Sequence, residues 1–334
     1  MTTRIAINGF GRIGRMVLRA LTESPRSDME IVAINDLTDA TRLAQLLKYD
    51  SVHGRFPGSV DNTDDSLIVN GSHIAVFAQR DPEDLPWGDL NIDIVMECTG
   101  FFLTQELAGK HIKAGAKKVL MSAPAKDDTK TIVFGVNHDT LEASDVFVSN
   151  ASCTTNALAP LVSVLHEEYG IVSGLMTTIH AYTGDQPTHD STHKDPYRGR
   201  AAALSMVPTT TGAAKAIGKV LPELMGKLDG MAVRVPVPNV SMVDLTVLVE
   251  KEASVSDIQA KFKAASAGRL QSVLGYVEDK IVSSDMNHDP HSSSVIADQL
   301  YVNGGKLVRV MSWYDNEWGF SNRMLDTASV MGRF

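Results

Sequence analysis

A glycine-rich turn lies between a strand and a helix near the start of the chain, and it constrains the fold more than any other feature. Arg4–Asn8 (RIAIN) is a short β-branched run typical of a buried strand. It leads into GFGRIG at 9–14, which fits G-x-G-x-x-G, and Arg12–Leu21 has the apolar spacing of a helix. A second apolar run, Ile31–Asn35, ends in Asp36. This order predicts an α/β fold with a doubly wound parallel sheet.

The same pattern predicts a dinucleotide site. Glycines let the backbone turn tightly and approach a pyrophosphate, whose charge lies at the N-terminus of the helix. The carboxylate of Asp36 would accept hydrogen bonds from a ribose and repel a 2′-phosphate, which favours NAD over NADP. Glycine turns often only close a helix onto a strand, but here every part of the pattern agrees. The turn supplies Gly9, Gly11 and Gly14.

Two further strand-like runs end in small polar residues. Asp93–Met96 runs into ECTG at 97–100, and Lys118–Met121 runs into SAPA at 122–125. Ligands of open parallel sheets bind beyond the carboxyl ends of strands, so Thr99 would lie near the ligand, although ordinary turn chemistry explains it equally well. Cys98 is interpreted as buried and unreactive.

Composition excludes several classes of protein. The chain has 334 residues, which predicts two domains, and a formal net charge of −9, which argues against a nucleic-acid partner. No apolar run approaches the roughly 18 residues that span a bilayer, so no membrane partner is expected. The chain has only two cysteines, Cys98 and Cys153, so neither a disulfide scaffold nor a metal site is expected. Free thiols stay reduced in the cytoplasm, so a cytoplasmic location is expected.

Cys153 lies at the start of a predicted helix. The strand-like run Val146–Ser149 precedes it, and apolar residues at helical spacing follow it as far as Gly170. Ser152 or an adjacent Thr is a good N-cap, and Pro160 is expected near the first turn, where it costs least. Free backbone N–H groups at such an end favour thiolate over thiol. The alternative is a cysteine that only caps a helix.

Other polar residues suggest partners for this thiol, without placing them beside it. His180 ends a strand-like run, where a histidine is more often a surface residue than a base, so a Cys/His pair is a hypothesis. PTTTGAAKA at 208–216 opens another helix with hydroxyls and a glycine, which suits a phosphate or plain capping. Arg234 lies in an apolar run, so either a carboxylate or an anionic ligand should meet it.

The chain resembles phosphorylating glyceraldehyde-3-phosphate dehydrogenase along essentially its whole length. The motifs that carry the resemblance are INGFGRIGR, ECTG, SNASCTTN, HAYTGDQ, PTTTGAAKA, RVPVPNVSMVDLT and WYDNEWGFSNR. It implies a Rossmann NAD-binding domain at 1–151 and an α+β catalytic domain with a largely antiparallel sheet at 152–316. It also implies that 317–334 form a C-terminal helix that packs back on the first domain, and that the protein is a homotetramer.

The resemblance also implies a mechanism. The Cys153 thiolate would attack the aldehyde of glyceraldehyde 3-phosphate, and His180 would take the hydroxyl proton of the hemithioacetal while a hydride passes to the nicotinamide. Inorganic phosphate would then attack the thioester and release 1,3-bisphosphoglycerate, a step of glycolysis or gluconeogenesis.

Matching motifs assign the remaining site residues. The substrate phosphate would be held by Thr183, Asp185 and Arg234, and the attacking phosphate by Ser152, Thr154, Arg198, Thr211 and Gly212. The cofactor site would comprise Gly9, Gly11, Arg12, Ile13, Gly14, Asp36, Arg80, Thr99, Gly100 and Ser122, with Asn316 on the nicotinamide carboxamide.

Two alternatives stay open at this point. An erythrose-4-phosphate dehydrogenase would share the Cys/His pair but release an acid by hydrolysis, whereas the intact PTTTGAAKA and Arg198 favour phosphorolysis. A non-catalytic NAD-binding regulator is the second alternative, and the presence of both chemical residues counts against it. The small polar pair Ser191–Thr192 leaves some use of NADP open, although the charge of Asp36 favours NAD.

Overall fold

The computed structural model describes residues 2–334, which divide into two compact units. Unit 1 consists of residues 2–132, His138–Ala151 and Ser321–Phe334. Unit 2 consists of Val133–Asn137 and Ser152–Phe320. The domain limits that the resemblance implies, after residues 151 and 316, stay a prediction.

Unit 1 is built on a nine-stranded sheet whose central strands are all parallel. In sheet order the strands are β10 (Lys130–Thr131), β11 (Phe147–Ser149), β9 (Lys118–Met121), β8 (Ile94–Glu97), β1 (Thr3–Asn8), β2 (Met29–Asn35), β7 (Ser72–Phe77), β6 (Ser66–Val69) and β5 (Val60–Asn62). β5 and β6 form an antiparallel edge. Because β1 lies at the centre, with β2 on one side and β8 on the other, the strand order reverses beside β1, as in a doubly wound fold.

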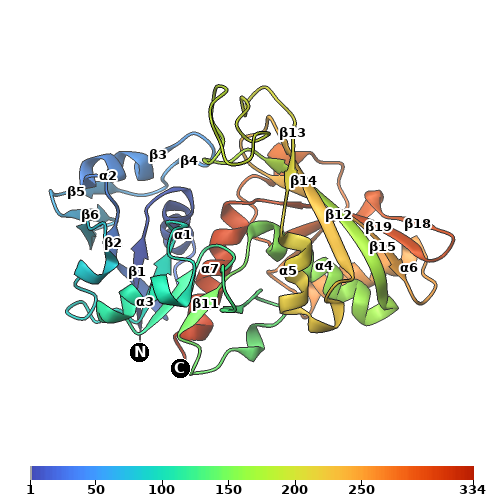
Figure 1. The fold of residues 1–334 in the computed structure, drawn as a ribbon, viewed down its shortest axis with the longest axis horizontal. Helices are drawn as coiled ribbons and strands as arrows, with labels where there is room; N and C mark the ends of the chain where they lie inside the picture. Colours follow the sequence, from blue (N-terminus) through green and yellow to red (C-terminus); the bar gives the residue numbers. More distant parts are fainter. Residues whose placement is uncertain (1) are drawn as a thin grey trace. The chain divides into compact units, whose positions relative to one another are not determined.

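Helices and short strands complete unit 1. They are α1 (Arg12–Glu23), α2 (Ala40–Lys48), α3 (Gln105–Lys113), the 3₁₀ turns Pro82–Asp84 and His138–Thr140, and the hairpin of β3 (Tyr49–Asp50) and β4 (Gly54–Arg55) (Figure 1). The predicted strand from Arg4 and the predicted helix from Arg12 are confirmed within two residues at each end. The last helix, α7 (Trp318–Met331), contributes its residues from Ser321 onward to unit 1.

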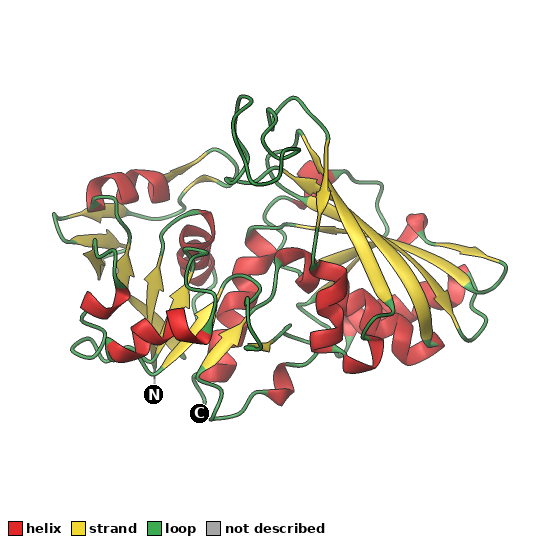
Figure 2. Ribbon diagram, viewed as in Figure 1, coloured by secondary structure: helices red, strands yellow, loops and turns green. Residues whose placement is uncertain are grey.

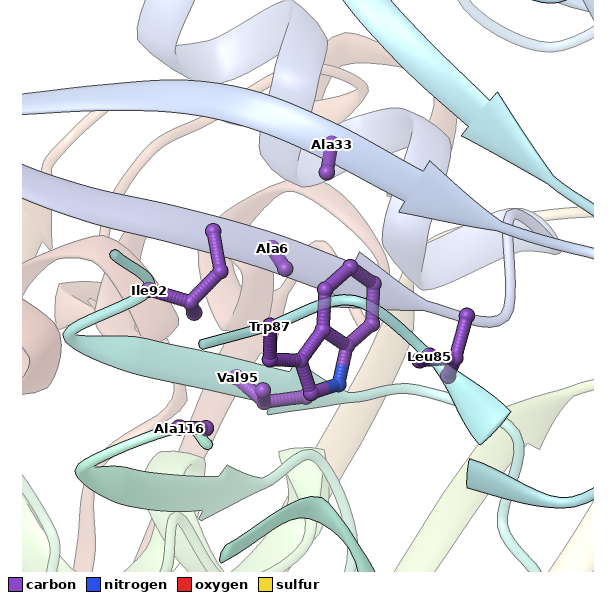
Figure 3. Packing of buried hydrophobic residues seen from close by; sticks show 7 residues of the cluster. All are labelled: Ala6, Ala33, Leu85, Trp87, Ile92, Val95 and Ala116. Carbon is purple, nitrogen blue, oxygen red and sulfur yellow. The ribbon is translucent and has the colours of Figure 1, made fainter. Parts of the chain in front are cut away.

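The core of unit 1 includes a cluster of small and branched residues around one tryptophan. Trp87 is fully buried, and Figure 3 shows its indole lying among alanine and aliphatic side chains. The cluster consists of Ala6, Ala33, Leu85, Trp87, Ile92, Val95 and Ala116. Alanines from β1 and β2 leave room for the large ring, so volume is matched across the sheet face.

Unit 2 contains an eight-stranded sheet that is largely antiparallel. Its strands are β13 (Val207–Thr210), β14 (Leu228–Val235), β12 (Ile171–Ala181), β15 (Ser241–Val249), β19 (Leu307–Tyr314), β17 (Ser293–Ile296) and β16 (Leu274–Val277), with β18 (Tyr301–Asn303) paired to β19. The pairs β12–β14 and β16–β17 are parallel. Figure 2 shows the long strands side by side. The sheet packs against α4 (Cys153–Tyr169), α5 (Ala213–Val220) and α6 (Val255–Ala267), and the 3₁₀ turns are Pro222–Leu224, Ser283–Met286 and Ala297–Gln299.

The helix that follows the cysteine differs from its prediction in one respect. α4 starts at Cys153 and is capped at its other end by Gly170, as the spacing predicts. Pro160, however, lies inside the helix, in its third turn rather than near its first. Proline cannot donate the helical hydrogen bond, but the buried apolar face of this long helix outweighs that loss.

No helix among residues 2–334 combines the length and the apolar character that crossing a membrane requires. Within the same residues no cluster of His, Cys, Asp and Glu side chains is arranged to hold a metal ion.

Candidate active site

Cys153 and His180 meet inside unit 2. Cys153 is the first residue of α4, and His180 is the next-to-last residue of β12, so a helix N-terminus and a strand end bring them together. The sulfur lies 3.5 Å from His180 Nε2. The other ring nitrogen, Nδ1, lies 2.7 Å from the carbonyl oxygen of Ala181. A carbonyl oxygen only accepts, so Nδ1 carries the ring proton and Nε2 presents a lone pair to the thiol.

Burial controls the charge of this pair. It raises the pKa of the Cys153 thiol, against the pull of the Arg234 guanidinium. Burial, together with Arg234, lowers the pKa of His180 to about 3. Each shift disfavours a single charge on either group. The pair therefore keeps zero net charge over a wide range of pH, and moving the thiol proton to Nε2 leaves that net charge unchanged.

The backbone N–H groups of Thr154 and Cys153 at the start of α4 lower the pKa of the Cys153 thiol, as the sequence predicts, but they do not act alone. The dipole does act at this end of α4, but the desolvation that accompanies burial is the larger effect and raises the pKa. A thiolate at Cys153 requires a nearby acceptor for its proton. His180 Nε2 occupies that position.

The residues assigned to the substrate phosphate lie close together. Arg234 Nη1 donates to Thr183 Oγ1 at 3.0 Å and to the Ala181 carbonyl at 3.0 Å, and Thr183 Oγ1 donates to Asp185 at 2.5 Å. Among the described residues Arg234 forms no ion pair, and its Nε is buried without a hydrogen bond. Thr183 Oγ1 connects Arg234 to the carboxylate of Asp185, whose charge also acts on Arg234, so the carboxylate and the anionic ligand both stay open as partners of this guanidinium.

The residues assigned to the attacking phosphate are only partly brought together. Arg198 pairs with Asp185 at 3.0 Å, so the two predicted anion sets are joined by one carboxylate rather than separated. Ser152 Oγ accepts from Thr155 N at 3.0 Å and is the N-cap of α4. Thr154 Oγ1 lies 2.9 Å from the hydroxyl of Tyr314. Gly212 is the N-cap of α5 without a side-chain bond, and Thr211 Oγ1 accepts from the N–H of residue 213.

A pocket of about 470 Å³ lies within unit 1, at the carboxyl ends of the parallel strands. Its lining consists of Asn8, Gly9, Gly11, Asn35, Asp36, Leu37, Gln79, Arg80, Cys98, Thr99, Phe101 and Phe102. Five of the residues assigned to the cofactor are in this set. Cys98 also lines it and is half-buried rather than fully buried, and burial raises the pKa of its thiol to about 12.

The glycines of the turn have separate steric roles. A Cβ on Gly9, whose φ is +91°, would lie 2.8 Å from Thr99, and one on Gly14 would lie 2.2 Å from the Gly9 carbonyl oxygen. A Cβ on Gly11 would meet nothing within 4 Å, so the space beside it is open. Gly11 is also the N-cap of α1, which has no side-chain cap. An open helix N-terminus beside a carboxylate, Asp36, fits the pyrophosphate and ribose of a dinucleotide.

The other residues assigned to the cofactor are not among those that line this pocket. The guanidinium of Arg12 pairs with Asp50 at 2.5 Å, and although burial opposes it, this pairing holds the pKa of Asp50 at about 2. Gly100 has a φ of +76° and is exposed, Ile13 and Ser122 are half-buried, and Asn316 lies in unit 2.

Sequence reasoning missed a buried polar network beneath the pocket. Glu97, at the end of β8, is fully buried and accepts from Asn8 Nδ2 at 2.6 Å and from the N–H and hydroxyl of Thr99. His111 Nε2 lies 3.2 Å from the same carboxylate. Trp87 Nε1 donates to His111 Nδ1 at 3.1 Å, so the ring proton is on Nε2 and points to Glu97. The only sequence signal was the position of Glu97 at a strand end.

Comparison with known proteins decides the family. Residues 3–105 match the model of the glyceraldehyde 3-phosphate dehydrogenase NAD binding domain, and residues 152–316 match that of the C-terminal domain. Curated proteins named glyceraldehyde-3-phosphate dehydrogenase are similar over nearly their whole length. The one from Cereibacter sphaeroides is 59% identical over 333 residues, covering 100% of this chain and 99% of its own. The one from Geobacillus stearothermophilus is 56% identical over 332 residues, covering 99% and 98%.

The chain belongs to the glyceraldehyde 3-phosphate dehydrogenase family. The resemblance found in the motifs is confirmed, as is the fold class of a Rossmann domain joined to a largely antiparallel second domain. It is an NAD-dependent oxidoreductase. In this member of the glyceraldehyde 3-phosphate dehydrogenase family, the pocket of unit 1 lies within the matched NAD-binding segment.

Proposed function

We propose that the chain oxidises glyceraldehyde 3-phosphate and phosphorylates it to 1,3-bisphosphoglycerate, with Cys153 as nucleophile and His180 as base. The observation that carries this proposal is the 3.5 Å approach of Cys153 Sγ to a His180 Nε2 whose lone pair faces it. No third group is needed to orient the ring, because the Ala181 carbonyl already fixes its tautomer.

The steps follow from this arrangement. His180 Nε2 takes the thiol proton as sulfur bonds to the aldehyde carbon, and the imidazolium returns that proton to the resulting oxyanion, which gives a hemithioacetal. His180 then takes the hydroxyl proton as the carbon becomes a thioester carbonyl. When bound, NAD would supply the acceptor for the hydride that leaves this carbon. An oxygen of inorganic phosphate attacks the thioester, the C–S bond breaks, and sulfur returns as the leaving group.

Two anions must be held for this sequence. We assign the substrate phosphate to Thr183, Asp185 and Arg234, supported by the buried Arg234 Nε, which has no partner within the described residues. The attacking phosphate is assigned to a second set that adjoins the N-termini of α4 and α5, where backbone N–H groups favour an anion. It consists of Ser152, Thr154, Arg198, Thr211 and Gly212. Asp185 pairs with Arg198, and it must release Arg198 when the attacking phosphate enters.

NAD would be held by the glycine turn, with Asp36 on its ribose and Asn316 on its nicotinamide carboxamide. Asp36 accepts from Phe10 N at 2.8 Å and from Thr38 N at 3.1 Å, which fixes the carboxylate at the end of β2 and leaves it further lone pairs. The rest of the cofactor set is Gly9, Gly11, Arg12, Ile13, Gly14, Arg80, Thr99, Gly100 and Ser122. We place the enzyme in the cytoplasm, where its two thiols stay reduced.

We also propose that the protein is a homotetramer. One face of the unit 2 sheet is exposed and carries large apolar side chains at Leu175, Met231, Leu248 and Leu307, all at least 41% exposed. The strand register places Leu248 opposite Leu307, so these residues share a face. A second copy packed on this face would cover it. Analytical ultracentrifugation should give four chains per particle, and a monomer would contradict the assembly.

One assay tests the reaction. With glyceraldehyde 3-phosphate and NAD, turnover should require inorganic phosphate, and without phosphate NADH formation should stop after about one equivalent per site. NADP should support a lower rate, because Asp36 repels a 2′-phosphate. Phosphate-independent turnover of erythrose 4-phosphate, faster than that of glyceraldehyde 3-phosphate, would instead indicate an erythrose-4-phosphate dehydrogenase. NAD binding without any turnover would indicate a regulator.

A further inference from the structure

A buried serine links the strand that carries His180 to Asn316. Ser241 is the first residue of β15 and is 1% exposed. Its hydroxyl oxygen accepts from the backbone N–H of Ala181 at 3.0 Å and lies 2.8 Å from the side-chain oxygen of Asn316. All of these atoms belong to unit 2.

The direction of both hydrogen bonds is fixed by chemistry. A backbone N–H can only donate, so the Ser241 oxygen is the acceptor from Ala181. The single hydroxyl proton is then free to point at the carboxamide oxygen of Asn316. Because that oxygen is engaged, the NH₂ group of Asn316 is the half of the carboxamide left to donate to a ligand. Without Ser241, a rotation of about 180° about the last side-chain torsion would exchange the two halves at little cost.

We propose that Ser241 is a positioning residue that holds the carboxamide of Asn316 with its NH₂ group presented to the nicotinamide end of NAD. The inference rests on the function proposed above, in which Asn316 meets the nicotinamide carboxamide. The anchor is the strand end at Ala181, whose carbonyl also holds His180 Nδ1. One stretch of β12 thus sets both the base and, through Ser241, the residue that orients the cofactor ring.

The test compares NAD with ADP-ribose, which lacks the nicotinamide. Ser241→Ala should weaken NAD binding about tenfold in a calorimetric titration, the loss of one well-oriented hydrogen bond, and should leave the dissociation constant of ADP-ribose unchanged. Ser312→Ala is the matched control, because Ser312 is also fully buried in the sheet and accepts from Ser293 at 2.9 Å. Ser312→Ala should lower the melting temperature about as much as Ser241→Ala does, and it should change the dissociation constant of neither NAD nor ADP-ribose.

A double variant separates this inference from the assignment of Asn316. Asn316→Ala should weaken NAD binding, and adding Ser241→Ala to it should weaken binding no further, because Ser241 acts through Asn316. If Asn316→Ala binds NAD normally, the assignment of Asn316 itself is wrong. If Asn316→Ala is weakened but Ser241→Ala is not, or if Ser241→Ala loses ADP-ribose and NAD equally, the positioning role is overturned. Should Ser241→Ala not fold, Ser241→Cys, a weaker donor of similar size, carries the same expectations.

Discussion

Two buried histidines in this protein sit beside a second titratable group, and their surroundings differ in a way that separates structure from chemistry. In unit 1, His111 receives a hydrogen bond from Trp87 on one side and gives one to Glu97 on the other. In unit 2, His180 is held on one side by the Ala181 carbonyl, while its other nitrogen lies 3.5 Å from the thiol of Cys153.

The difference lies in how completely each pair is satisfied. Both oxygens of Glu97 accept hydrogen bonds and both ring nitrogens of His111 are engaged, so the donors and acceptors of this network are matched. The thiol–imidazole pair has one proton and two places for it. A saturated buried network stabilises a fold, and an unsaturated one retains the capacity to react. Substitutions in the two regions should therefore affect different measurements.

The largest effect should come from the thiol of the unsaturated pair. Cys153→Ser should lower dehydrogenase turnover on the order of 10⁴-fold or more, because a hydroxyl beside a neutral imidazole is a much weaker nucleophile, while NAD binding is kept. Cys98→Ser is the matched control for thiol labelling. It should still incorporate one equivalent of iodoacetamide at the wild-type rate, whereas Cys153→Ser should incorporate none. Labelling of Cys98 in preference to Cys153 would refute the comparison.

The next largest effect should come from the imidazole. His180→Asn should lower turnover about 10²–10⁴-fold, the usual contribution of a positioned base. The pH dependence of alkylation is the sharper measurement. In the wild type the pair has zero net charge from well above the His180 pKa of about 3 up to the raised pKa of the thiol, so the alkylation rate should be flat between about pH 5 and 8.

In His180→Asn the thiol must lose its proton to water. Its pKa is raised by burial, so over the same range the thiolate fraction and the alkylation rate should rise about tenfold per pH unit. Parallel, flat profiles for the variant and the wild type would mean that His180 is not the proton acceptor.

Substitution in the saturated pair of Glu97 and His111 should instead lower the stability of the fold. Glu97→Gln replaces one carboxylate oxygen by an NH₂ group. In one orientation this group faces the donors of His111 and Asn8, and in the other it faces the N–H of Thr99. Either clash should lower the free energy of unfolding by about 3 kcal/mol. Hydrogen exchange of β1 and β8 would report this loss in unit 1 separately. Glu83→Gln is the control, because Glu83 pairs with Lys113 at the surface and should cost under about 1 kcal/mol. An equal, small effect for both substitutions would contradict the structural role of Glu97.

Local patterns predicted the first strand and helix of unit 1. The run before Gly9 and the spacing after it place β1 and α1 within two residues, because apolar periodicity records which face is buried. Pro160 was misplaced because the start of a long helix depends on its N-cap, whereas the tolerance of a proline depends on tertiary packing, which no local window contains.

For the candidate site too, local sequence predicted single residues, whereas their contacts depend on tertiary packing. Residue types and motifs predicted Cys153 and His180 individually, but their 3.5 Å contact joins a helix start to a strand end that lie 27 residues apart. Glu97 and His111 left almost no signal, since a glutamate after an apolar strand and a histidine on a helix are ordinary in sequence. Their meaning arises only from mutual burial. The effect of burial on the pKa of Cys153 left no signal in the sequence either, because desolvation is a property of the folded environment.

The smallest expected effect compares two helix caps. Thr104 caps α3 in unit 1 by accepting from Leu107 N at 3.2 Å, and Ser152 caps α4 in unit 2 by accepting from Thr155 N at 3.0 Å. Thr104→Ala and Ser152→Ala should each lower stability by about 1 kcal/mol, the usual worth of an N-cap. Only Ser152→Ala should also raise the KM for inorganic phosphate several-fold, because the same hydroxyl is assigned to the attacking anion. If steady-state kinetics show equal phosphate KM values for the two variants, Ser152 is a cap and nothing more.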